Sequence, residues 1–194
     1  MELKVNQLSK SFGTLNVFTQ LNLSLHSGQV YCLMGSSGSG KTTFFRILLG
    51  LEEADSGSME GLKGQRASAV FQENRLCESF TPVDNITMVI PGRSSRSRKQ
   101  AKEELLRLLP EEALSRPVST LSGGMKRRVA IVRALSIPCD MILMDEPFTG
   151  LDENTKRTVI QYIKKKTRGK LVIISTHQEE DVALLNGTLI NLIE

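Results

Sequence analysis

The order of apolar and polar residues along the chain predicts strands that alternate with helices. Short continuous apolar runs are typical of strands buried on both faces. Such runs occupy residues 30–34 (VYCLM), 67–71 (ASAVF), 141–144 (MILM) and 171–175 (LVIIS). Alternation of apolar and polar residues at 3–8 (LKVNQL) and 21–25 (LNLSL) predicts two half-exposed strands before them.

Helical patterns follow several of these runs. Residues 41–50 (KTTFFRILLG) end in a glycine, and residues 152–169 begin at Asp152 and end at Gly169, which are helix start and stop signals. A serine and two glycines in residues 121–130 (LSGGMKRRVA) lead into another expected helix. Strand, helix and strand in repetition predict a largely parallel sheet of the α/β class.

Residues 73 to about 118 interrupt this rhythm, because they favour helices, lack strand patterns and are divided by prolines. Their helical patterns lie at 81–90, 97–109 and 111–114. We expect a small helical subdomain within a single domain, residues 1–194, whose core is formed by 1–72 and 119–194. A short strand at 188–193 (TLINLI) is expected last.

Length and composition describe an ordinary globular protein. A chain of 194 residues can bury one good core. The chain is 40% apolar and 24% charged, and no apolar run approaches the roughly 20 residues that span a bilayer. The N-terminus lacks the apolar stretch of a secretory signal, so we expect a cytoplasmic protein.

The net charge and the positions of the cysteines bear on nucleic-acid binding and on metal binding. The net charge is +4, and the most basic segment, 92–100 (GRSSRSRKQ), has no aromatic residue for base stacking, so we expect no nucleic-acid partner. A solvated loop is favoured there, with acidic lipid head groups or a protein partner as alternatives. Cys32, Cys77 and Cys139 lie far apart and away from both histidines, which favours buried reduced thiols over a zinc site.

One glycine-rich segment has the pattern of a phosphate-binding loop. Residues 35–42 (GSSGSGKT) match G-x-x-x-x-G-K-[ST] between a predicted strand and a predicted helix. Backbone amides of such a loop surround phosphate oxygens, while Lys41 reaches the terminal phosphates and Thr42 offers a hydroxyl to Mg²⁺. The expected phosphate-binding residues are Gly35, Ser36, Ser37, Gly38, Ser39, Gly40, Lys41, Thr42 and Thr43.

Two carboxylates follow one of the buried strands. Asp145 and Glu146 end the run at 141–144, which places them at the carboxyl edge of the sheet, where open α/β sheets bind ligands. One acid can hold Mg²⁺, and the other can orient and deprotonate the water that attacks the γ-phosphate. The alternative is that both acids only cap the next turn.

Together these motifs resemble those of the ATP-binding subunits of ABC transporters. GSSGSGKT resembles the Walker A motif, VFQE with Gln72 the glutamine loop, LSGGM the family signature and MILMDE the Walker B motif with its catalytic glutamate. GLD ending at Asp152 resembles the D-loop, and STHQ with His177 the switch histidine. The resemblance covers essentially the whole chain and implies a P-loop NTPase fold of the ABC ATPase type, with a mainly parallel sheet core, an N-terminal antiparallel β part and a small helical subdomain.

The resemblance also implies a site shared between two subunits. Asp145 would hold Mg²⁺, and Glu146 would act as the catalytic base. Residues Ser122, Gly123 and Gly124 would bind the γ-phosphate held by the Walker A loop of a facing subunit, because small residues at a helix N-terminus expose amides to an anion.

Four further residues take roles from the same resemblance. Gln72 would bind Mg²⁺ and water and sense a membrane partner, and His177 would contact the γ-phosphate and organise the attacking water. Phe12 would stack on adenine, and Asp152 would couple the two sites. The alternatives are a solvated glutamine, a structural histidine, a phenylalanine packed into the first sheet and an N-cap at Asp152, which could coexist with the coupling role.

The implied function is an ATP-binding and ATP-hydrolysing subunit that powers solute transport through ATP-driven dimerisation, with ATP and Mg²⁺ as cofactors. FQENRL and the methionine after LSGG resemble the bacterial importer group for nitrate, sulfonates and taurine. Implied partners are a second copy, transmembrane permease subunits and, through them, an extracytoplasmic solute-binding protein, with the chain peripheral on the inner face of the cell membrane. A soluble ABC-type ATPase or a nucleotide-dependent regulatory subunit is the alternative.

Overall fold

The computed structural model describes residues 1–92 and 94–192. Arg93 of the basic segment and Ile193 of the last predicted strand lie outside the described residues. The chain folds into two compact units. The first unit comprises residues 1–69, 139–146 and 167–194, and the second comprises residues 70–138 and 147–166.

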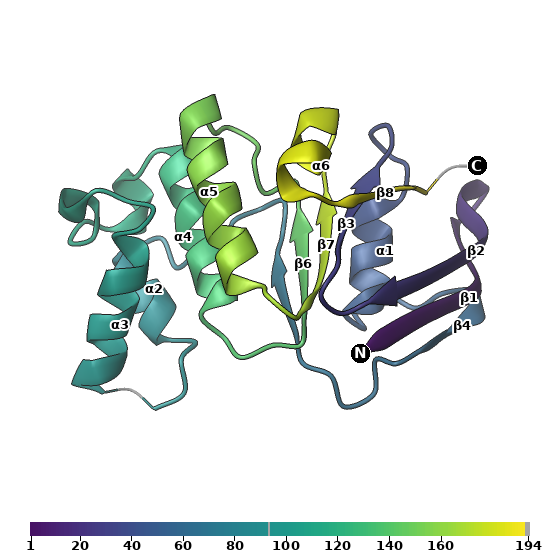
Figure 1. Cartoon of the computed structure of the whole chain (residues 1–194), viewed down its shortest axis with the longest axis horizontal. Helices are drawn as coiled ribbons and strands as arrows, with labels where there is room; N and C mark the ends of the chain where they lie inside the picture. The colour runs from purple at the N-terminus through teal and green to yellow at the C-terminus, as the bar shows by residue number, and fades with distance from the viewer. Residues whose placement is uncertain (93, 193–194) are drawn as a thin grey trace. The chain divides into compact units, whose positions relative to one another are not determined.

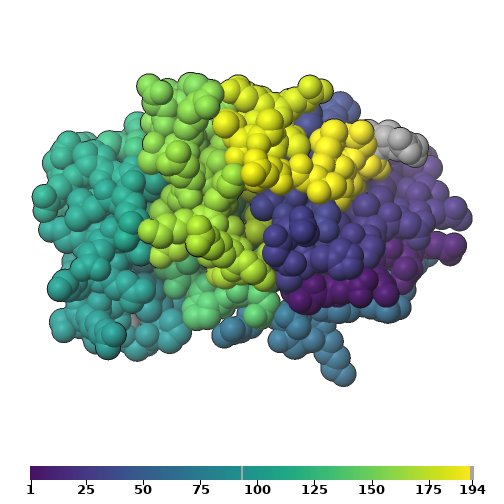
Figure 2. Space-filling view, in the orientation of Figure 1, coloured from purple at the N-terminus to yellow at the C-terminus, as the bar shows by residue number. Residues whose placement is uncertain are grey.

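The first unit contains a three-stranded antiparallel sheet in the order β2-β1-β4. Its strands are β1 (Glu2–Phe12), β2 (Leu15–His26) and β4 (Ser56–Glu60). Leu3, Val5 and Leu8 of β1 are buried between exposed neighbours, which confirms the predicted half-exposed strand. In the space-filling view, this N-terminal sheet (purple) and the C-terminal segment of the same unit (yellow) both reach the surface (Figure 2).

Strand β4 is an element that sequence patterns do not predict. Its sequence, SGSME, is polar and largely exposed. A Cβ atom at Gly57 would lie 2.5 Å from the carbonyl oxygen of Gln7, and one at Gly61 would lie 1.9 Å from that of Glu2. The backbone here approaches β1 so closely that only glycine fits at these two positions, and backbone pairing rather than apolar burial defines the strand.

A five-stranded sheet in the order β5-β6-β7-β3-β8 belongs to the first unit, except for Val70 at the end of β5 (Figure 1). Its strands are β3 (Val30–Met34), β5 (Ala67–Val70), β6 (Met141–Asp145), β7 (Leu171–Ser175) and β8 (Thr188–Asn191). Strand β7 pairs in parallel with β3 and β6, and β3 pairs in parallel with β8. Ser175 is level with Leu33 on one side and with Asp145 on the other, so the carboxyl ends of three strands meet at one edge.

The core of the first unit lies where helix α1 (Lys41–Leu48) meets both sheets. Phe44, Phe45, Ile47 and Leu48 of this helix are buried in the same apolar cluster as side chains of both sheets. Helix α6 (Glu179–Leu185) connects β7 to β8. The parallel sheet and the separate antiparallel part that the sequence predicts are both confirmed.

Helices and 3₁₀ turns make up the second unit. They are α2 (Pro82–Thr87), α3 (Ser95–Leu105), η1 (Glu111–Ala113), η2 (Val118–Thr120), α4 (Gly123–Leu135) and α5 (Glu153–Lys166). Helices α4 and α5 lie side by side (Figure 1). The predicted helices between 73 and 118 are present, although 111–114 forms only a 3₁₀ turn, and no strand occurs there among the described residues. Within the described part of the chain, no helix combines the length and apolar character needed to cross a membrane.

The three cysteines are free thiols. Cys32 and Cys139 are buried, as predicted, and burial raises the pKa of the Cys32 thiol to about 11. The prediction is wrong for Cys77, which is exposed because it lies in the irregular segment that follows β5. No group of three or more histidine, cysteine or acidic residues that could hold a metal occurs among the described residues.

Replacing Phe44 by alanine should destabilise the first unit strongly. The Phe44 side chain is fully buried, and its ring meets that of Phe18 edge-to-face at 6.3 Å between centroids. We expect a loss of about 3–5 kcal/mol in the free energy of unfolding, measured by urea titration. Phe12→Ala is the matched control, since Phe12 is 48% exposed and should cost less than about 1 kcal/mol. Equal losses in the two variants would contradict the assignment of Phe44 to the core.

Candidate functional site

The glycine-rich loop between β3 and α1 is shaped by backbone conformations that favour glycine. Gly38 and Gly40 have φ angles of 84° and 87°, in the left-handed region. A Cβ atom at Gly40 would lie 2.3 Å from Cγ1 of Val17, so a side chain is excluded there. Gly40 is also the N-cap of α1, and the amide of Phe44 donates to its carbonyl oxygen. The loop therefore passes directly into the helix N-terminus, as the sequence predicts.

Lys41 lies inside this loop. Its side chain is nearly buried, and its ammonium group donates to the carbonyl oxygens of Gly35 at 2.8 Å and Ser36 at 3.0 Å and to Oγ of Ser39 at 3.2 Å. The loop thus surrounds the cation with its own oxygens. A positive charge is held in the segment where the sequence predicts phosphate binding.

A buried carboxylate connects the loop to the strand ends. Asp145, at the end of β6, accepts a hydrogen bond from Thr42 Oγ1 at 2.7 Å and another from Ser175 Oγ at 2.6 Å. Asp145 is 4% exposed, and Ser175 is fully buried. The structure therefore brings together the hydroxyl and the carboxylate that the sequence proposes as metal ligands.

Glu146 and His177 form a second contact at the same edge. Glu146 has a φ angle of 47°, and its amide donates to Ser175 Oγ at 2.8 Å. Its Oε1 lies 2.6 Å from Nε2 of His177, a contact that requires a proton on the imidazole nitrogen or on the carboxyl. Both side chains are partly exposed, at 22% and 44%, so solvent reaches the pair. The predicted base and the predicted switch histidine are hydrogen-bonded to each other.

Ser175 was not among the predicted site residues. Its hydroxyl donates to Asp145 and accepts from the amide of Glu146, so one side chain fixes both acids. The sequence signal is weak, because the serine ends an apolar run and looks like the last residue of a buried strand. Its importance depends on the strand order, which places β7 beside β6.

The turn that carries His177 is also fixed by a side chain. Thr176 Oγ1 donates to Asp181 Oδ2 at 2.5 Å and accepts from the amide of Gln178 at 3.2 Å. These bonds tie the residues on both sides of His177 to the first turn of α6. The histidine is therefore positioned by its neighbours and by Glu146.

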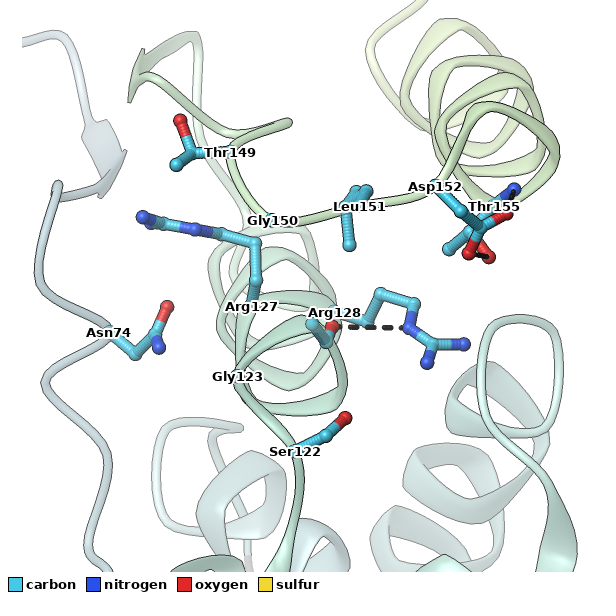
Figure 3. A pocket seen from close by; sticks show the side chains of 11 residues that line it. Asn74, Ser122, Gly123, Arg127, Arg128, Thr149, Gly150, Leu151, Asp152 and Thr155 are labelled. Atoms are coloured by element: carbon cyan, nitrogen blue, oxygen red, sulfur yellow. Dashed lines mark hydrogen bonds between the residues drawn. The ribbon is translucent and has the colours of Figure 1, made fainter.

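The predicted signature residues lie in the second unit, at the start of α4. Ser122 is the N-cap, and its Oγ accepts from the amide of Met125 at 3.3 Å. Gly123 and Gly124 form the first helical turn, and a Cβ atom at Gly123 would meet nothing within 4 Å. These residues line a pocket of about 500 Å³ together with Arg127, Arg128 and Asp152 (Figure 3). Both guanidinium groups donate to backbone carbonyl oxygens, and the Asp152 carboxylate also lines the pocket. The amides at the start of α4 are therefore the part of the pocket that suits an anion.

Asp152 caps helix α5, as one sequence interpretation predicts. Its Oδ1 accepts from the amide of Thr155 at 3.0 Å, and its Oδ2 accepts from the Thr155 hydroxyl at 2.6 Å. These hydrogen bonds from Thr155 lower the pKa of the Asp152 carboxyl, because they stabilise the charged form. The cap is confirmed, and the coupling role stays a prediction.

The remaining two candidates are both exposed. Gln72 lies in the second unit, and its carbonyl oxygen accepts from Arg127. Phe12 is 48% exposed, and the ammonium group of Lys10 lies 4.9 Å from its ring centroid. The alternative of a Phe12 side chain packed into the first sheet is therefore wrong. Stacking on adenine and binding of Mg²⁺ by Gln72 stay predictions.

A family model described as "ABC transporter" matches residues 18–149. The chain belongs to the ABC transporter family. The match includes the Walker A loop, Gln72, the signature and the Walker B acids, while Asp152 and His177 lie beyond it. The resemblance stated from the motifs is confirmed.

Curated relatives of this ABC transporter family member include two import proteins. The chain is 39% identical to the aliphatic sulfonates import ATP-binding protein SsuB of Corynebacterium glutamicum, over 96% of the chain and 78% of that protein. It is 34% identical to the sulfate/thiosulfate import ATP-binding protein CysA of Halalkalibacterium halodurans, over 93% of the chain and 56% of that protein. The chain thus spans little more than half the length of this second relative.

Among solved structures, the fold matches the ATP-binding cassette MJ0796, determined as a dimer in a post-hydrolysis state bound to ADP and Pi. The TM-score is 0.86 and the identity 28%, covering 98% of this chain and 94% of that one. This match confirms the predicted ABC ATPase fold class.

Replacing Ser175 by alanine should weaken the first unit and disorganise both acids. The change leaves Oδ1 of Asp145 and the amide of Glu146 without the hydroxyl that joins them, at a cost of about 1–3 kcal/mol in the free energy of unfolding. Urea titration measures this loss. Ser24→Ala is the control, because Ser24 is an exposed residue of β2 and should change stability by less than about 0.5 kcal/mol. If Ser175→Ala matched the control, Ser175 would not organise the site.

Proposed function

We propose that this chain is the ATP-binding and ATP-hydrolysing subunit of a bacterial ABC importer. The observation that carries the proposal is the group at one edge of the parallel sheet, where Thr42 contacts Asp145 and His177 contacts Glu146. This edge carries a phosphate-binding loop, a pair of metal ligands, and a base with its hydrogen-bond partner. Transfer of a phosphoryl group to water requires these groups.

The residues present fit a magnesium ion. Mg²⁺ prefers hard oxygen ligands, keeps several waters, and is usually bound by one or two carboxylates together with substrate phosphates. Thr42 Oγ1 and Asp145 Oδ2, which are 2.7 Å apart, are such oxygens, and Gln72 is the further ligand that the resemblance proposes. When bound, the ion would neutralise charge that develops on the phosphate oxygens.

The side chains of the protein would bind the nucleotide and position the attacking water. Lys41 would exchange the loop carbonyl oxygens for the terminal phosphates and neutralise their charge. Glu146 would orient the attacking water and accept its proton, and His177 would hold the Glu146 carboxylate in place through the contact at 2.6 Å. Phe12 would stack on the adenine ring.

We further propose that the signature pocket acts on the nucleotide of a second copy. Ser122, Gly123 and Gly124 present helix N-terminal amides beside Arg127 and Arg128, and the Walker A loop belongs to the other compact unit. The related cassette MJ0796 is a dimer with ADP and Pi. Asp152 would connect the two sites across that interface.

Import is proposed as the direction because both curated relatives described above are import ATP-binding proteins. Such a task requires transmembrane permease subunits as partners and a position on the inner face of the cell membrane, with an extracytoplasmic solute-binding protein acting through the permease. The segment from Gln72 to about Ser119 is the proposed docking region. Intact Lys41, Glu146 and His177 favour turnover over a regulatory subunit without hydrolysis.

Lys41→Ala should strongly lower the rate of ATP hydrolysis. Loss of the loop cation removes charge stabilisation of the transferred phosphoryl group, so we expect phosphate release to fall by on the order of 10²–10³. Steady-state phosphate release with Mg²⁺ measures this, on the purified protein or on its complex with the permease. Lys4→Ala, at an exposed lysine of β1 in the same unit, is the matched control and should retain the parent rate. An active Lys41→Ala variant would defeat the assignment.

Glu146→Gln should accumulate an ATP-bound dimer. The change removes the proposed base and leaves both phosphate-binding segments intact, so ATP binding must favour the dimer by linkage. Sedimentation should shift from monomer towards dimer with ATP but not with ADP. Adding Ser122→Arg should abolish the shift, because Ser122 is exposed and a bulky side chain would collide with the facing phosphate. A protein that binds ATP tightly yet stays monomeric, alone and with the permease, would count against the shared site.

A further inference from the structure

The segment that carries Gln72 is bonded to the signature helix α4 at two points. Arg127 and Arg133, both on α4, donate to backbone carbonyl oxygens between Phe71 and Arg75. All of these residues belong to the second unit. The contacts were not visible in the sequence, where both arginines look like members of a polar helix face.

Arg127 holds the two carbonyl groups at the start of the segment. Its Nη1 donates to the oxygen of Phe71 at 2.6 Å, and its Nη2 donates to the oxygen of Gln72 at 2.5 Å. The residue is 5% exposed, so these charge-assisted bonds form away from water. Figure 3 shows Arg127 extending from α4 toward the part of the chain that carries Asn74. Only the planar fork of a guanidinium group can bond both oxygens from one rigid donor.

Arg133 holds the end of the same segment. Its Nη1 donates to the oxygen of Arg75 at 2.8 Å, and its Nη2 donates to that of Asn74 at 3.1 Å. Six residues separate the two arginines on α4, which corresponds to about 9 Å along the helix axis. The segment therefore runs alongside the helix and is bonded to it on both sides of Glu73.

The segment also folds back on itself. Arg75 has a φ angle of 47°, and its guanidinium carbon lies 3.7 Å from the ring centroid of Phe71. Lys126, near the start of α4, forms an ion pair with Glu78 at 2.8 Å, so the chain has returned toward the helix N-terminus by that point. The result is a compact loop that leaves Gln72 exposed at the surface.

We propose that Arg127 and Arg133 are positioning residues that make the Gln72 segment and the signature helix one rigid piece. This inference rests on the proposed role of Gln72 in hydrolysis. With the carbonyl groups of Phe71 and Gln72 both bonded to Arg127, the backbone at Gln72 is restrained, so the point from which the side chain leaves the main chain is fixed relative to α4. Any displacement of the signature glycines at the start of α4 then carries Gln72 with it.

The rigidity can be measured without nucleotide by limited trypsin digestion. Trypsin can cleave after Arg75 only when the loop around this residue has opened. The carbonyl oxygen of Arg75 belongs to the scissile bond and is bonded to Arg133 in the closed loop. In Arg127→Lys and in Arg133→Lys, we expect cleavage between Arg75 and Leu76 to start roughly tenfold faster, because one charge-assisted hydrogen bond is lost and trypsin acts on the opened population. Mass spectrometry identifies the first cleavage site.

Arg116→Lys is the matched control. Arg116 is also an arginine that donates to a backbone carbonyl oxygen, that of Thr120 at 3.0 Å, but it is exposed and this acceptor lies outside residues 71–75. It should leave the cleavage rate at Arg75 unchanged. Urea titration of all three variants shows whether the fold is retained, since a charge-conserving change keeps the buried cation.

Hydrolysis kinetics then test whether the arginines act through Gln72. Arg127→Lys should lower kcat roughly tenfold and leave KM for ATP within about twofold, because the Walker A loop lies in the other unit. In a double-mutant cycle, Arg127→Lys combined with Gln72→Ala should be no slower than Gln72→Ala alone. A general structural role would instead make the two losses multiply.

The digestion and the kinetics together support or overturn the positioning role of Arg127 and Arg133. Faster cleavage at Arg75 together with non-additive losses supports the proposal. Unchanged cleavage in both lysine variants, or losses that multiply, overturns it and leaves the proposed ATPase intact. Gln72→Ala with the parent kcat would overturn the role assigned to Gln72, and with it the positioning role, even if cleavage were faster. If the parent protein did not bind nucleotide, the proposed function itself would be overturned.

Discussion

The two hydrogen bonds accepted by Asp145 join three parts of the first unit that are far apart in the sequence. Thr42 belongs to α1, Asp145 ends β6, and Ser175 ends β7. A carboxylate that is 4% exposed needs such partners, because an unpaired buried charge is very costly. The pairing is possible only because β6 and β7 are parallel neighbours with Asp145 level with Ser175. Sheet order and register thus decide where the chemistry can occur.

The same constraint accounts for the strained conformation of Glu146. A non-glycine residue with a φ of 47° costs on the order of 1–3 kcal/mol and persists only where its surroundings hold it. Ser175 binds its amide, and His177 binds its carboxylate. This turn directs the Glu146 side chain toward His177, while Asp145, one residue earlier, points to Thr42. Two adjacent acids therefore receive different environments and can take different roles.

Patterns that depend on local sequence were sufficient for most of the first unit. The loop at 35–42 needs glycines wherever it occurs, and strands β3, β5, β6 and β7 coincide with short apolar runs, so both could be predicted. Strand β4 could not, because it is defined by backbone pairing with β1, and the close approach to β1 at Gly57 and Gly61, rather than by apolar burial. The role of Ser175 could not be predicted for a related reason, because a serine at the end of β7 contacts both acids only when β6 is the neighbouring strand.

Buried polar contacts of the second unit show the limit of sequence patterns most clearly. Arg127 lies in a run of four residues, MKRR, three of them basic, that would suit a solvated helix face, yet it is 5% exposed and bonded to two carbonyl groups. A charged side chain is buried only where hydrogen-bond acceptors offset the free-energy cost of its desolvation. The burial of Arg127 therefore marks a segment whose carbonyl groups are held in place. In the first unit, strand register fixes the acids. In the second, helix α4 begins with the signature glycines and bonds the carbonyl group of Gln72 through Arg127, so one helix is in contact with both motifs.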